Sequence, residues 1–146
     1  LGKIKLDSVP EGLEDKLMVM KYLSKNNRSY NQGGDVKMGW VTFRSKAFGS
    51  FYVAMDTIAP RVKLITELTE NSKGKIQFKV TDDLSGIEHY DAYLNGKWIL
   101  LSWEPKRARM WLNLDQLPNA RLKKNNQLKL VIEDERGNVS SKVYSF

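Results

Sequence analysis

Hydrophobic and polar residues alternate along most of this chain, which is the pattern of β-strands with one buried and one exposed face. The clearest example is residues 75–82, where Ile76, Phe78 and Val80 alternate with charged and polar residues. Residues 16–23 form an apolar run with few β-branched residues, so the pattern there also fits a helix, but the turn residues at both ends favour a strand. We therefore expect an all-β protein.

Turn residues divide the second part of the chain into short segments. Asn95-Gly96, between two alternating segments, predicts a hairpin with a type I′ turn. Further turns are expected at 71–74 and from Pro118 through Asn126. Seven strands with turns every 8 to 12 residues are typical of an immunoglobulin-like or fibronectin-like β-sandwich.

A boundary between two units is expected just before Pro60. The alternating segment 51–56 ends there, and proline restricts the backbone of the residue before it to extended conformations. We predict a smaller β unit at residues 1–57 and an immunoglobulin-like β-sandwich at residues 58–146. The smaller unit has no cysteine to stabilise it and alternates from its first residues, so we expect it to pack on the second unit or on further sequence, in an excerpt of a longer protein.

Charge and composition narrow the classes of partner. The formal net charge is +7, and the basic excess is spread over both parts of the chain. The sequence contains no helix-turn-helix, zinc-finger or aromatic ribonucleoprotein motif, so nucleic acid is not an expected partner. No apolar run reaches the length of about 20 residues that a transmembrane helix needs.

Few residues offer catalytic chemistry. The chain has one histidine, His89, and no cysteine. A catalytic zinc site takes about three protein ligands, usually histidines. A catalytic triad needs a basic side chain beside its Ser or Cys nucleophile. Carboxylates occur at 82–83 and 133–135, so composition alone does not exclude the pair of catalytic carboxylates that a glycosidase uses. Both clusters lie at strand-to-turn junctions, where such residues commonly accept hydrogen bonds from turn amides. We expect no catalytic residue and no cofactor in this chain.

Four of the acidic residues also raise the question of a calcium site, since calcium takes several carboxylate oxygens. They are Asp56, Asp82, Asp83 and Asp134. Their spacing does not match an EF-hand, and the turn-capping interpretation is the simpler one.

A group of aromatic and basic residues is the best candidate for ligand binding. Three tryptophans follow one another along neighbouring predicted strands and flank a basic loop. Aromatic rings stack on sugar rings, and an arginine guanidinium binds a carboxylate through two parallel hydrogen bonds. If these side chains are exposed, they would suit a glycan or peptidoglycan ligand. The alternative is that the tryptophans belong to the core. The candidate ligand-binding residues are Trp98, Trp103, Arg107, Arg109 and Trp111.

Several segments carry a resemblance to a known family. They are Asp56-Thr57-Ile58-Ala59-Pro60, the run from Phe78 to Ile87, Leu94-Asn95-Gly96-Lys97-Trp98-Ile99, and Glu133-Asp134-Glu135-Arg136-Gly137-Asn138. With them, the chain resembles the C-terminal non-catalytic β-sandwich region of bacterial lysostaphin-type zinc metallopeptidases, which are peptidoglycan endopeptidases. The His-x-x-x-Asp and His-x-His zinc motifs of that family do not occur here, so no catalytic or zinc-binding residue is carried over.

The resemblance implies an accessory region of an exported cell-wall enzyme, in the cell envelope, the periplasm or the secreted fraction. Its partners would be an upstream zinc-containing peptidase domain and peptidoglycan or another envelope component. The alternative is a structural or adhesive immunoglobulin-like module of a bacterial surface protein with no enzyme attached.

Overall fold

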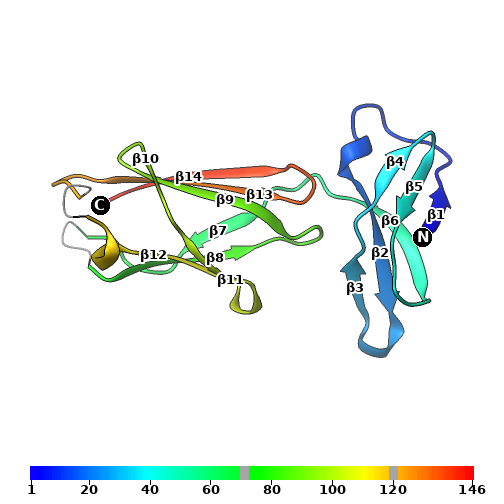
Figure 1. The fold of residues 1–146 in the computed structure, drawn as a ribbon, viewed down its shortest axis with the longest axis horizontal. Helices are drawn as coiled ribbons and strands as arrows, with labels where there is room; N and C mark the ends of the chain where they lie inside the picture. Colours follow the sequence, from blue (N-terminus) through cyan, green and yellow to red (C-terminus); the bar gives the residue numbers. More distant parts are fainter. Residues whose placement is uncertain (70–72, 119–121) are drawn as a thin grey trace. The chain divides into compact units, whose positions relative to one another are not determined.

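The computed structural model describes residues 1–69, 73–118 and 122–146. The chain divides into two compact units, Leu1–Ile58 (unit 1) and Ala59–Phe146 (unit 2) (Figure 1). The sequence prediction placed the join between residues 57 and 58. Parts of the turn predicted at 71–74 and of the loop predicted after Pro118 lie outside the described residues.

Unit 1 consists of two three-stranded antiparallel sheets, with strand orders β1-β5-β4 and β3-β2-β6. The run at 16–23 forms strand β2 after the short 3-10 helix η1 (Glu14–Lys16), so the helical alternative is wrong there. The strands are β1 (Gly2–Lys5), β2 (Leu17–Leu23), β3 (Arg28–Asn31), β4 (Asp35–Lys37), β5 (Trp40–Phe43) and β6 (Ser50–Met55).

The core of unit 1 is small. Val19, Val41 and Phe43 are buried together, and partly buried side chains such as Ile4 and Phe51 pack against them. Met38 has a φ of 51° and the following Gly39 a φ of 76°, so these two residues form the turn between β4 and β5. A methionine with positive φ is rare.

Unit 2 contains two four-stranded antiparallel sheets, with strand orders β10-β9-β13-β14 and β11-β12-β8-β7. Eight strands are described where seven were expected. The extra one arises because residues 97–104 form two three-residue strands that belong to different sheets. The strands are β7 (Arg61–Leu64), β8 (Lys75–Thr81), β9 (Ile87–Leu94), β10 (Lys97–Ile99), β11 (Ser102–Glu104), β12 (Arg109–Asn113), β13 (Gln127–Asp134) and β14 (Val139–Ser145).

Both sheets of unit 2 contribute side chains to one hydrophobic core. Ile76, Phe78 and Val80 of β8 are buried, as the alternation predicted, and so are Leu128 and Leu130 of β13. Because side chains alternate across a strand, the intervening residues of β8 lie on the outer face of the sheet. The all-β prediction is thus confirmed for the described residues.

The hairpin turn between β9 and β10 has the predicted backbone. Asn95 and Gly96 have φ values of 53° and 80°, and a type I′ turn requires positive φ at both of its central residues. The Asn95 side chain also joins the turn to β13, since its Oδ1 accepts a hydrogen bond of 3.0 Å from the Gln127 amide. This turn therefore connects two strands and tethers a third.

Helical structure in the described residues is limited to 3-10 turns, which include η2 (Ser24–Asn26), η3 (Pro105–Arg107) and η4 (Leu114–Gln116). Within the parts of the chain described, no helix has the length and apolarity needed to cross a membrane.

Candidate functional site

A basic depression lies on the outer face of the sheet β11-β12-β8-β7. Its volume is about 390 Å³. We call it the Trp111 depression. It is lined by Lys75, Gln77, Glu104, Arg107, Arg109 and Trp111.

Strand alternation puts these side chains on the same face. Met110 and Leu112 of β12 point into the core, so Arg109 and Trp111 point outward. Trp111 pairs with Gln77 in the register of β12 and β8, and these two residues therefore lie side by side. Arg107 comes from η3, which ends at Ala108 in the left-handed conformation with a φ of 52°.

The depression carries an excess of positive charge. It contains three cationic side chains and one carboxylate. The Lys75 Nζ lies 5.3 Å from the centre of the Trp111 ring, within range of a cation–π interaction. The carboxylate of Glu104 lies 3.6 Å from Arg107 Nε, and both side chains are exposed, so this ion pair contributes little and leaves Arg107 able to bind another anion.

The structure brings together three of the five predicted ligand-binding residues, namely Arg107, Arg109 and Trp111. Trp103 of β11 packs against the core of unit 2 and does not line the depression. Trp98 lies on β10, in the other sheet, where its Nε1 donates a 2.8 Å hydrogen bond to Asp91.

Three lining residues, Lys75, Gln77 and Glu104, were not predicted. Lys75 and Gln77 are outward-facing residues of β8, whose alternation was recognised in the sequence, so the signal for them was available. What the alternation alone could not supply is the pairing of β8 with β12, which places Lys75 beside the Trp111 ring.

The acidic residues considered for calcium have structural roles in turns. The Asp82 carboxylate accepts hydrogen bonds from the amides of Leu84 (3.1 Å) and Gly86 (2.9 Å). Asp134 is buried, and its carboxylate accepts from the amides of Arg136 (2.8 Å) and Asn138 (2.9 Å). The turn-capping interpretation is confirmed for both residues.

The other two acids of that hypothesis have other partners. Asp83 forms a two-pronged ion pair with Arg61, in which Nη1 lies 2.8 Å from Oδ2. This hydrogen bond lowers the pKa of the Asp83 carboxyl and raises the pKa of the Arg61 guanidinium. Asp56 belongs to unit 1, where its Oδ1 accepts a hydrogen bond of 3.2 Å from the Ile58 amide.

His89 is an outward-facing residue of β9. Its side chain is 69% exposed, and its Nε2 lies 3.9 Å from a carboxylate oxygen of Glu88. It is a surface residue of a strand in the other sheet of unit 2, and it does not line the Trp111 depression.

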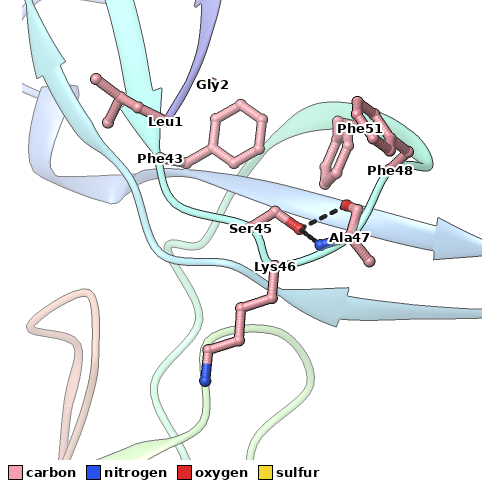
Figure 2. A pocket seen from close by; sticks show the side chains of 8 residues that line it. All are labelled: Leu1, Gly2, Phe43, Ser45, Lys46, Ala47, Phe48 and Phe51. Carbon is pink, nitrogen blue, oxygen red and sulfur yellow. Dashed lines mark hydrogen bonds between the residues drawn. The ribbon is translucent and has the colours of Figure 1, made fainter.

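Unit 1 has a depression of its own, with a volume of about 320 Å³ and walls made largely of aromatic rings (Figure 2). The rings of Phe43 and Phe51 are 4.9 Å apart and tilted by 47°, and Phe48 beside them is fully exposed. In Figure 2 the Lys46 side chain points away from these rings. Such a surface offers apolar contact, and none of its eight lining residues is a carboxylate or a histidine.

A family model described as a Zu5-like domain matches residues 3–56, which lie within unit 1. No curated protein sequence matches the chain.

Proposed function

We propose that this chain is a non-catalytic binding module whose unit 2 binds an anionic glycan in the Trp111 depression. The observation that carries the proposal is the composition of that depression, an aromatic ring surrounded by three cations on an outer sheet face. An indole face stacks on the apolar side of a sugar ring, and arginine forks bind carboxylates in two-pronged geometry.

The contact between Lys75 and Trp111 favours an acidic ligand over a neutral one. The Lys75 ammonium lies over the Trp111 ring. An acidic group would attract this flexible lysine to itself and leave the ring face open for the sugar. A neutral sugar would have to compete with the cation for the same face.

We also propose that unit 2 is a sandwich of the immunoglobulin-like type. With β7 to β14 taken as strands A, B, C, C′, D, E, F and G, the two observed orders correspond to A-B-E-D and C′-C-F-G. In such folds, strand faces and end loops are the surfaces that carry binding sites.

The biological setting that we propose is the bacterial cell envelope. The resemblance to the C-terminal region of lysostaphin-type zinc metallopeptidases supports an accessory role beside a peptidase domain, with peptidoglycan as the ligand. Peptidoglycan combines sugar rings with carboxylates of its peptides, which is the chemistry that the depression offers. The module would hold such an enzyme on its polymeric substrate.

The test is sedimentation with purified peptidoglycan sacculi at low and high salt. The chain is expected to co-sediment, and Trp111→Ala is expected to weaken binding about tenfold through loss of the stacking surface. Trp98→Ala is the matched control, because it removes an exposed tryptophan from the other sheet. High salt is expected to weaken binding, because the exposed cations contribute to it. Equal binding by the two variants, or no binding at low salt, would contradict the proposal.

A further inference from the structure

A second, larger depression lies at the β7 edge of the sheet that carries the Trp111 depression, where Ser140 and Lys142 of β14 in the other sheet also line it. Its volume is about 860 Å³, and it runs along β7 and the neighbouring part of β8. Three lysines line it: Lys63 of β7, Lys79 of β8 and Lys142 of β14. We call it the lysine groove.

One row of side chains across the strands connects the two depressions. Arg109, which lines the first, pairs with Lys79, and Lys79 pairs with Lys63 in the next strand. All three residues point outward, because their neighbours along each strand are core residues. Adjacent strands are about 4.8 Å apart, so the row places three cations over about 10 Å.

The acidic residues of the lysine groove do not neutralise these lysines. Asp83 is paired with Arg61, and Asp82 accepts hydrogen bonds from two turn amides. Within the described part of the chain, none of the three lysines forms an ion pair. The groove therefore presents a positive surface that continues the positive surface around Trp111.

We propose that the two depressions form one track for a linear acidic polysaccharide, which runs across the strands from Trp111 toward Lys142. This inference rests on the proposed function and adds that the ligand is a polymer with acidic groups at several positions. Charge complementarity favours a polyanion. A single-stranded nucleic acid is less suited, since its binding commonly uses several aromatic side chains for successive bases, and among the described residues of this sheet face Trp111 is the one aromatic side chain that points outward.

The inference predicts that affinity grows with ligand length. A disaccharide of galacturonic acid fills only the Trp111 depression, whereas the hexasaccharide also reaches the lysine groove. By calorimetry on the full chain, we expect the hexasaccharide to bind about thirtyfold more tightly than the disaccharide, through the added contacts of the second subsite. A neutral hexasaccharide of glucose is the control for charge.

A double variant measures the contribution of the lysine groove to binding separately from that of the Trp111 depression. Lys63→Ala/Lys79→Ala is expected to weaken hexasaccharide binding about tenfold and to change disaccharide binding less than twofold. The charge-matched control, Lys97→Ala/Lys129→Ala in the other sheet, is expected to leave both affinities unchanged.

These experiments distinguish failure of the proposed track from failure of the proposed function. If both ligands bind equally and need Trp111, the track is wrong while the proposed function stands. If binding does not need Trp111, both ideas are wrong. If neither ligand binds, the track is wrong, and sedimentation with peptidoglycan sacculi tests the proposed function separately. Tighter binding of a single-stranded oligonucleotide of equal charge than of the hexasaccharide would also overturn the track and assign the basic face to nucleic acid.

Discussion

At the scale of the residue, the backbone conformation of Gly96 limits which side chains this position accepts. Its φ of 80° is one that side chains with a Cβ rarely adopt, while the space around it is open. Gly96→Val should therefore lower the free energy of unfolding by about 1 kcal/mol or more through backbone strain alone.

The matched control is Gly96→Asn, because asparagine accepts positive φ more readily than a β-branched residue does. Thermal unfolding followed by tryptophan fluorescence reports mainly on unit 2, which holds three of the four tryptophans. A valine variant that melts like the parent chain would show that the turn is not the type I′ turn assigned to it.

The ion pair of Asp83 and Arg61 should make the stability of the fold depend on pH. Its hydrogen bond lowers the pKa of Asp83 in the folded chain below the ordinary value of 3.8. The pair therefore stabilises the fold above that ordinary value, and its contribution is lost as the pH falls through the lower, folded-state pKa. Because both side chains are exposed, the contribution is small.

NMR titration of the Asp83 carboxyl carbon measures this shift directly. Arg61→Gln removes the guanidinium and should return the Asp83 pKa to its ordinary range. An unchanged titration midpoint in the variant would mean that the ion pair does not form in solution.

At the scale of the element, β8 contributes to the core through one face and to the candidate site through the other. Phe78 is fully buried between the sheets, while its neighbour Lys79 points outward. Phe78→Ala should cost about 3–5 kcal/mol of stability, and Lys79→Ala should stay within about 0.5 kcal/mol. Urea unfolding of the two variants tests this contrast, and comparable losses would mean that the strand is rotated or shifted in register.

Elements with strong alternation could be predicted from sequence, and the candidate site could be predicted in part. The core residues of β8 and the positive φ of the Asn95-Gly96 turn followed from local patterns. The division of residues 97–104 between two sheets did not, because each strand has only three residues and gives too little pattern.

The residues next to each tryptophan already indicate whether its side chain points toward the core or toward solvent, but the sequence prediction did not use them. Trp111 lies between Met110 and Leu112, and two inward-pointing neighbours imply an outward-pointing tryptophan. Trp103 lies between Ser102 and Glu104, so the same argument places it inward, against the core. The contact of Lys75 with Trp111 depends on strand pairing between distant segments, which no local pattern reveals.

At the scale of the whole molecule, unit 2 should fold without unit 1. Unit 2 has a large core to which both of its sheets contribute, whereas unit 1 has a small one centred on Val19, Val41 and Phe43. Residues 59–146 expressed alone are expected to unfold cooperatively, as a domain with its own core does. A product without a cooperative transition, with loosely packed side chains, would mean that unit 2 depends on unit 1.

The most direct test of the central claim, that the outer face of the sheet β11-β12-β8-β7 binds an acidic glycan, is an NMR titration of the full chain with the galacturonic acid hexasaccharide. The four indole N–H signals can be assigned by single substitutions. The signals of the Trp111 indole and of the amides of residues 75–79 and 107–111 are expected to shift, while that of the Trp98 indole on the other sheet is not. Shifts centred on Trp98, or no shift at any indole, would contradict it.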